Sequence, residues 1–205
     1  MIEVLVLYYS KFGATEALAR EVCQGVDAVD EVAARLRTVP AVSLVTEASA
    51  VAIPEDGPPY ASIDDLRECA GLVMGSPTRF GNMAASLKYF LDGTGSEWLS
   101  GTLAGKPAGV FTSTSTLHGG QETTLLTMAM PLMHHGMLIV GLPYTEDALS
   151  TTTSGGTPYG ASHVTWNRDA DRLSEEEKHL ARALGNRVAK IAVRLSATFA
   201  SQESP

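Results

Sequence analysis

Short apolar runs bounded by small residues recur along this chain and constrain its fold more than any other feature. These runs do not alternate apolar with polar side chains, which is the pattern of strands buried on both faces of a parallel sheet. The runs that predict central strands are residues 4–7, 72–74, 108–111 and 138–140. Residues 32–39 alternate instead, with Arg35 and Arg37 on one side, so they are predicted to form an edge strand.

Helical patterns occupy the intervals between the predicted strands. Asn82 is predicted to cap one of these helices, and Ser174 with Glu177 forms a capping box before the last one. Apolar residues recur at helical spacing over residues 14–29, 82–91 and 121–134, and again after residue 174. The alternation predicts a doubly wound α/β fold, in which a five-stranded parallel sheet of order 2-1-3-4-5 carries helices on both faces.

We expect residues 1–205 to form a single domain. The hydrophobic content of 44% suffices to bury one core, and no linker divides the sequence. Two stretches, near residues 40–62 and 143–173, do not fit regular elements. Long excursions in a compact domain are usually functional, so these two are expected to shape a binding site or a subunit interface.

Charge and residue usage exclude several classes of protein. The formal net charge is −8 at pH 7, whereas proteins that bind nucleic acid present basic surfaces, so no nucleic-acid partner is expected. No apolar run approaches the roughly 20 residues of a membrane helix, and no cleavable leader is evident, so we expect a cytoplasmic protein without membrane insertion. Cys23 and Cys69 have no zinc-ligand spacing, so neither a metal site nor a disulfide is expected.

The segment Tyr-Ser-Lys-Phe-Gly-Ala-Thr, residues 9–15, joins the first predicted strand to the first predicted helix. Ser10 and Thr15 supply hydroxyls, Gly13 lets the backbone bend, and the N–H groups of a helix start favour an anion. The lysine spacing of a nucleoside triphosphatase loop is absent, so a monophosphate such as flavin mononucleotide (FMN) is the first candidate ligand. The alternative is a turn in which Ser, Gly and Thr serve only backbone geometry and capping.

Two more loops are predicted at the same edge of the sheet. In residues 75–83, Pro77 fixes backbone N–H groups for the pyrimidine edge of a flavin, Arg79 favours negative charge near N1 and O2, and Phe80 lines the ring. Residues 112–121 consist mainly of Ser, Thr and Gly, which let the backbone approach a planar ligand. The alternatives are a turn with a surface arginine and a flexible polar connection.

Two residues outside these loops are further candidates for the site. Trp98 has no periodic apolar partners, so it is predicted to stack on an aromatic substrate or to pack in an interface. His134 is predicted to meet a flavin or quinone oxygen, or to be solvated at the end of its helix, and pairing with His135 as metal ligands is disfavoured because adjacent helix residues diverge. No Ser-His-Asp arrangement stands out, so no catalytic side chain is assigned and a bound cofactor is expected to carry redox chemistry.

Several motifs in register resemble those of the WrbA family, the flavodoxin-like NAD(P)H:quinone oxidoreductases. They are residues 4–13, 76–83, 119–122, 134–137 and 155–161. The resemblance implies an FMN-binding enzyme, commonly a homotetramer, that reduces quinones by two electrons with NAD(P)H. It places Trp98 and Phe12 at the substrate and assigns FMN contacts to Ser10, Lys11, Phe12, Gly13, Ala14, Thr15, Pro77, Thr78, Arg79, Phe80, Ser113, Thr114, Ser115, Thr116, Leu117, His118, Gly119 and His134.

The resemblance also implies a mechanism. NAD(P)H passes a hydride to flavin N5 and leaves before a quinone binds over the same face, which is a ping-pong reaction. This chain departs from the family pattern at Phe12, where the family often has a tyrosine, and in residues 114–120, a loop longer by one residue. The alternative is a flavodoxin-type one-electron carrier without substrate turnover, against which Trp98 and the two excursions argue. The choice between NADH and NADPH, and the physiological quinone, stay open.

Overall fold

The computed structural model describes residues 1–42, 57–166 and 172–202. Its strands form one parallel sheet in the order β2-β1-β3-β4-β5, which confirms the predicted order, and β6 also pairs with β4. The strands of this sheet are β1 (Ile2–Tyr8), β2 (Val32–Thr38), β3 (Gly71–Pro77), β4 (Pro107–Thr114), β5 (Leu138–Ile139) and β6 (Ala161–Val164).

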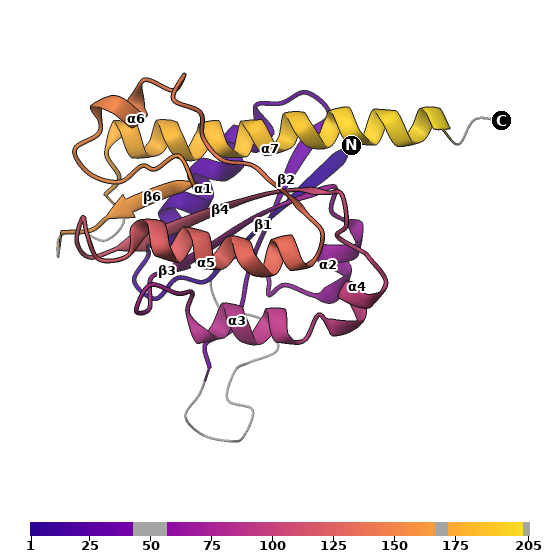
Figure 1. Cartoon of the computed structure of the whole chain (residues 1–205), viewed down its shortest axis with the longest axis horizontal. Coiled ribbons are helices and arrows are strands. Elements are labelled where there is room, and N and C mark those ends of the chain that lie inside the picture. The colour runs from indigo at the N-terminus through magenta and orange to yellow at the C-terminus, as the bar shows by residue number, and fades with distance from the viewer. Residues whose placement is uncertain (43–56, 167–171, 203–205) are drawn as a thin grey trace.

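Helices cover both faces of the sheet (Figure 1). Side chains of α1 and α7 pack on one face, and side chains of α2, α3 and α5 pack on the other. Within the described ranges, no helix has the length and apolar character needed to cross a bilayer. The helices are α1 (Ala14–Asp27), α2 (Ile63–Glu68), α3 (Ala85–Asp92), α4 (Gly95–Leu99), α5 (Gln121–His134), α6 (Ala148–Thr151) and α7 (Glu175–Gln202).

The central strands are apolar throughout because consecutive side chains enter two different cores. In β1, Val4 and Val6 pack under α1 and α7, whereas Leu5 and Leu7 pack on the opposite face. All four side chains are fully buried. Since burying one such side chain stabilises the fold by about 1.5–3 kcal/mol, the sheet is held from both sides. Because the strands run parallel, the carboxyl ends of β1, β3 and β4 lie at one edge of the sheet.

The last predicted strand needs correction. Residues 138–140 were expected to be buried at the sheet centre, but β5 has only two residues, and Leu138 and Ile139 are 48% and 38% exposed. Strand β5 pairs with the start of β4 and β6 pairs with its end, so together they form one interrupted edge strand. The stretch 143–173, expected to lack regular elements, thus contains β6 and the short helix α6.

Of the two helix caps predicted from the sequence, one is confirmed and the other is wrong. Ser174 and Glu177 form the predicted capping box of α7, with Glu177 N donating to Ser174 Oγ at 3.2 Å and Ser174 N donating to the Glu177 carboxylate at 2.9 Å. Asn82 is not a cap, because α3 begins at Ala85 and its preceding residue, Ala84, donates its N–H to Ser76 Oγ at 2.8 Å. Most of the stretch 40–62 lies outside the described residues.

Candidate functional site

The three loops predicted to bind a ligand, residues 9–15, 75–83 and 112–121, meet at the carboxyl edge of β1, β3 and β4. Together they enclose a cavity of about 440 Å³. The parallel strands explain this convergence, because ligands of open α/β sheets bind at the carboxyl ends where the strand order reverses. The cavity is lined by Ser10, Lys11, Phe12, Ala14, Thr15, Pro77, Thr78, Arg79, Ser113, Thr114, Ser115 and Thr165.

The loop after β1 leads into α1, a helix whose first turn has no side-chain cap. Gly13 precedes α1 with φ 89°, a left-handed conformation that favours glycine, and no side chain caps the helix start. Ser10 Oγ accepts the Gly13 N–H at 3.2 Å. The buried hydroxyl of Thr15 bonds that of Ser113 at 2.8 Å, which ties this loop to the end of β4. The N–H groups of the first turn of α1 thus have no side-chain cap and favour an anion.

The loop after β3 is a tight turn held by backbone and hydroxyl groups. Arg79 N donates to Asn82 O at 2.7 Å, and Asn82 N donates back to Arg79 O at 3.1 Å. Thr124 Oγ1 donates to Thr78 Oγ1 at 2.8 Å, which fixes Thr78 at the cavity wall. Phe80 has φ 54°, a strained value for a side chain of its size, and is fully exposed. Phe80, predicted to line the ring, does not line the cavity in this structure.

The loop after β4 is divided between two cavities. Ser113, Thr114 and Ser115 line the cavity described above, whereas Leu117 and His118 line a neighbouring cavity of about 420 Å³. Neither cavity includes Thr116 or Gly119 in its lining. Gln121 Nε2 donates to Leu117 O at 2.8 Å and so attaches the loop to the start of α5.

Sequence reasoning missed Thr165, which also lines the main cavity. Its N–H donates to Thr114 O at 2.9 Å, so it continues the pairing of β6 with β4. The signal was weak, because β6 has only four residues, including the polar Ser162 and His163, within the predicted excursion at residues 143–173. A strand there would have added Thr165 to the predicted site.

A buried carboxylate holds β6 and the residues around it in place. Glu177, at the start of α7, is 1% exposed. It accepts hydrogen bonds from His163 Nδ1 at 2.8 Å, Ser154 Oγ at 2.7 Å and Gly155 N at 2.8 Å, besides the Ser174 bond of the capping box and one from Val164 N at 3.1 Å. Burial would raise the pKa of Glu177, but these hydrogen bonds outweigh it and lower the pKa from 4.5 to about 2.

Trp98 and His134 lie together, away from the cavity. Trp98 Nε1 donates to His134 O at 3.0 Å, and the two rings are 5.4 Å apart. Helix α5 begins beside the cavity and ends at His134, and a helix of its 14 residues spans about 20 Å. Figure 1 shows α4, which carries Trp98, at the end of the molecule opposite β6. A single chain therefore does not bring Trp98 or His134 to the cavity.

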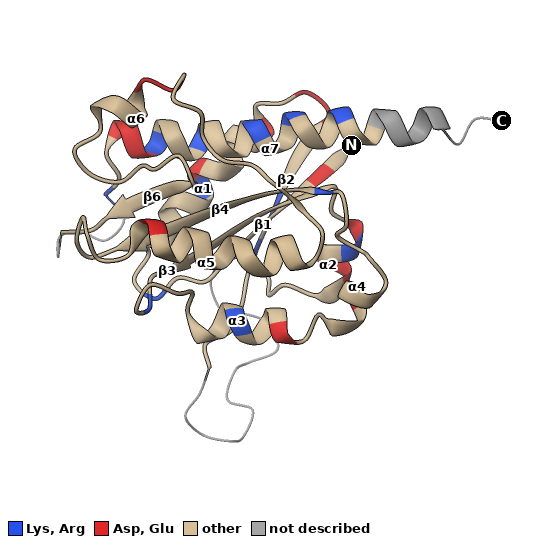
Figure 2. Ribbon diagram, in the orientation of Figure 1, with Lys and Arg blue, Asp and Glu red and all other residues tan. Residues whose placement is uncertain are grey.

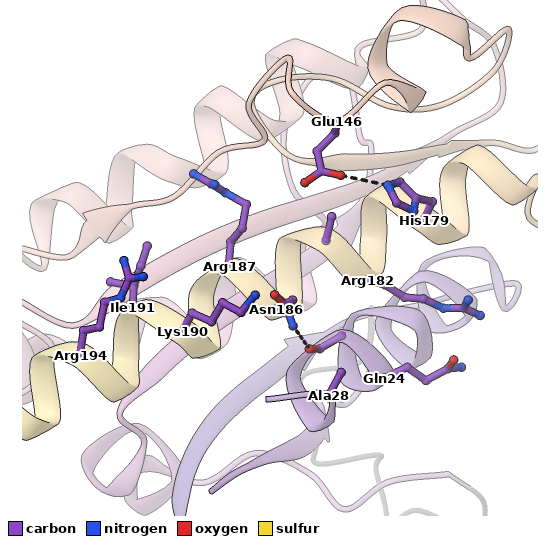
Figure 3. Close-up of a pocket in the computed structure, with 12 residues that line it drawn as sticks. Gln24, Ala28, Glu146, His179, Arg182, Asn186, Arg187, Lys190, Ile191 and Arg194 are labelled. Atoms are coloured by element: carbon purple, nitrogen blue, oxygen red, sulfur yellow. Dashed lines mark hydrogen bonds and ion pairs between the residues drawn. The ribbon is translucent and has the colours of Figure 1, made fainter. Parts of the chain in front are cut away.

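A second groove, of about 550 Å³, lies between α1 and α7. Figure 2 shows Lys and Arg recurring along α7, and Figure 3 shows their side chains around this groove. Two side chains that line this groove already have acidic partners: Arg182 bonds Glu21 at 2.6 Å, and His179 bonds Glu146 at 2.9 Å. None of the site residues predicted from sequence lines this groove.

The cavity at the sheet edge and the groove between α1 and α7 differ in the charges of the residues that line them. The cavity at the sheet edge has Lys11 and Arg79 in its lining and no acidic residue. It therefore suits an anion, and it lies where α/β folds bind their ligands. In the part of the chain that the structure describes, no group of three or more His, Cys, Asp or Glu side chains is arranged to hold a metal ion.

Comparisons with known proteins give the relatives of this chain. Residues 2–146 match the family described as NADPH-dependent FMN reductase. The chain is 44% identical over 206 aligned positions to a protein from Trichlorobacter lovleyi named NAD(P)H dehydrogenase (quinone), covering 96% of this chain and 100% of that protein.

Solved structures agree with the fold. A flavodoxin, WrbA-like protein from Agrobacterium tumefaciens superposes with TM-score 0.66 at 23% identity, covering 95% of this chain and 99% of that one. A flavodoxin from the domain Archaea gives TM-score 0.60 at 18% identity, covering 94% and 99%. The flavodoxin-like fold is thereby confirmed. Since the family model spans most of the chain and the Trichlorobacter relative nearly all of it, the protein belongs to the NADPH-dependent FMN reductase family.

Proposed function

We propose that this protein is an FMN-dependent NAD(P)H:quinone oxidoreductase. FMN is its cofactor, NAD(P)H its electron donor and a small quinone its acceptor. Family membership supports the cofactor and the donor, and the relative named NAD(P)H dehydrogenase (quinone) supports the acceptor. The observation that carries the proposal is the cavity at the sheet edge, which has an uncapped helix start, many hydroxyls and no acidic residue in its lining.

The residues of this cavity fit FMN. A phosphate monoester needs N–H and hydroxyl donors, which the first turn of α1, Ser10 and Thr15 supply. The small side chains of Ser113 and Ser115 leave space for a planar ring beside the loop after β3. The volume of about 440 Å³ falls within the usual range of small-ligand pockets.

The chain supplies binding and orientation. Bound FMN provides the redox chemistry, accepting a hydride from NAD(P)H and returning two electrons to a quinone. Ser10 and Thr15 would hold the phosphate, and Thr78, which is fixed by Thr124, would border the ring. The Arg79 guanidinium favours the extra negative charge of the reduced ring. Donor and acceptor would bind in turn at this cavity, which would give ping-pong kinetics.

An anaerobic stopped-flow measurement tests this function. FMN-loaded protein mixed with NADPH is expected to lose the flavin absorbance band, and the band is expected to return when benzoquinone is added. The Phe12→Tyr variant is expected to show a faster first phase, because it restores the hydroxyl that the family often has there. If FMN binds but NADPH and NADH both leave it oxidised, the oxidoreductase proposal fails and an electron carrier takes its place.

We further propose that the functional unit is a homotetramer. Leu126, Met130 and Met133 are 47%, 62% and 49% exposed along one side of α5. The exposed residues of β5 and the Trp98 side chain follow at the end of this helix. An apolar surface of this kind is typical of an interface. In such an assembly, the Trp98 and His134 pair of one subunit serves the cavity of another, which explains why one chain keeps them apart.

Introducing a charge on this apolar side of α5 tests the assembly. Met130→Glu is expected to convert the tetramer into smaller species, because each interface would then bury an unpaired carboxylate. Size-exclusion chromatography with light scattering measures the mass. Gln24→Glu is the matched control, since it adds the same charge on an exposed position of α1, on the opposite face of the sheet. A wild-type protein that is monomeric would contradict the proposal.

A further inference from the structure

A lysine lies at the rim of the main cavity, and the described part of the chain gives it no acidic partner. Lys11 lines this cavity and is exposed, and its Nζ lies 5.3 Å from the centre of the exposed Phe12 ring. Across residues 1–42, 57–166 and 172–202, no carboxylate lies within ion-pair distance of Lys11. An exposed cation over an aromatic ring is held weakly, so it is available to an incoming anion.

The phosphate of FMN has other donors at this cavity. The hydroxyls of Ser10 and Thr15, with the N–H groups at the uncapped start of α1, already supply donors for one phosphate. The Lys11 ammonium lies against Phe12 and makes no hydrogen bond to either hydroxyl. Its charge is therefore placed for a second anion that reaches the cavity from solvent.

We propose that Lys11 selects the electron donor and favours NADPH over NADH. This inference rests on the proposed function, in which a dinucleotide enters the same cavity. The 2′-phosphate of NADPH adds about 1.5–2 negative charges at neutral pH. Lys11 and Arg79 put positive charge on a cavity without acidic lining, in a chain of net charge −8. A quinone is uncharged, so the same lysine leaves its binding unaffected.

The expected size of the preference follows from the exposure of Lys11. Ion pairs between exposed groups change an equilibrium constant by up to about fivefold. Such a pair is screened by salt, because the Debye length falls from about 30 Å at 0.01 M to about 3 Å at 1 M ionic strength. The preference for NADPH should therefore be largest at low salt and should disappear at high salt.

Equilibrium binding of the oxidised dinucleotides tests the proposal without turnover. FMN-loaded protein is titrated with NADP⁺ and with NAD⁺, neither of which reduces the flavin, and the change in flavin absorbance gives each Kd. The wild type is expected to bind NADP⁺ about fivefold more tightly at low salt. Lys11→Met is expected to bind both dinucleotides equally once its flavin site is saturated, which fluorescence quenching of FMN establishes before the titration.

Lys190→Met is the matched control. Lys190 is exposed on α7, beside the groove of Figure 3, and its replacement removes the same charge without touching the cavity. This variant is expected to keep the preference for NADP⁺. Equal binding of the two dinucleotides by the wild type, or a preference for NADP⁺ that survives Lys11→Met or high salt, would overturn the inference. Failure of flavin reduction in the stopped-flow experiment would instead overturn the proposed function.

Discussion

Replacing Glu177 by glutamine is expected to lower the free energy of unfolding by about 3–5 kcal/mol. Glutamine has nearly the same volume, but its amide nitrogen would face donors at His163 Nδ1 and Ser174 N that now bond the carboxylate. Leaving one buried donor unsatisfied costs about 1–3 kcal/mol. Denaturant unfolding followed by circular dichroism measures the loss.

The pH dependence of the same protein gives a second measurement. The pKa of Glu177 is about 2 in the folded chain and 4.5 in the unfolded chain. The stabilisation of the fold by the ionised Glu177 is therefore present above about pH 4.5 and is lost as the pH falls towards 2. A shift of this size corresponds to about 3 kcal/mol. The stability difference between wild type and Glu177→Gln should therefore shrink across this interval.

Glu175→Gln is the matched control for this prediction. Glu175 occupies the same first turn of α7, but its side chain is 84% exposed and pairs with Lys178. Its replacement is expected to cost less than about 1 kcal/mol. If the two variants unfold at the same denaturant concentration, Glu177 does not hold β6 and the residues around it in the way the hydrogen bonds indicate.

The double variant Ser10→Ala/Thr15→Val is expected to weaken FMN binding by about 100-fold or more. Each hydroxyl that donates to a phosphate contributes about 1.5–3 kcal/mol, which is roughly 10- to 100-fold in affinity. Valine keeps the shape of Thr15, which is 1% exposed, but it removes the hydrogen bond to Ser113, so the folded state is checked separately. Titration of FMN fluorescence quenching measures the Kd, and circular dichroism checks the folded state.

The chain offers a control with the same chemistry at the opposite end of the molecule. The hydroxyls of Ser100 and Thr102 are 2.8 Å apart, as are those of Thr15 and Ser113, but they follow α4, away from the cavity. Ser100→Ala/Thr102→Val is therefore expected to leave the FMN affinity unchanged. An unaltered Kd in Ser10→Ala/Thr15→Val would mean that the loop after β1 does not bind the phosphate. The FMN site would then lose its main support.

Local sequence patterns predicted most of the fold for a physical reason. The strands β1, β3 and β4 are apolar at consecutive positions because both of their faces are covered, and this pattern is visible without a structure. The capping box of α7 uses residues three apart, so its signal is also local. Asn82 shows the limit of such signals, because Asn is common in turns as well as at caps and here closes a turn with Arg79.

The site was predictable to the extent that it depends on parallel strands. Three loops that follow parallel strands must meet at one edge, so Ser10, Thr78 and Ser113 were expected together, and all three line the cavity. Thr165 was missed because β6 is short and its pairing with β4 joins residues far apart in sequence. Nothing in the local pattern indicated that the edge strand would be interrupted between β5 and β6.

The sequence by itself determined the layered fold, the edge that carries the site and the small hydroxyl-rich loops that form it, because these depend on periodicity and on neighbouring residues. Only the tertiary structure decided which segment completes that edge, since the buried Glu177 gathers donors from separate parts of the chain. It also placed Trp98 and His134 at the far end of α5. These placements depend on distances between remote residues, which periodicity does not encode.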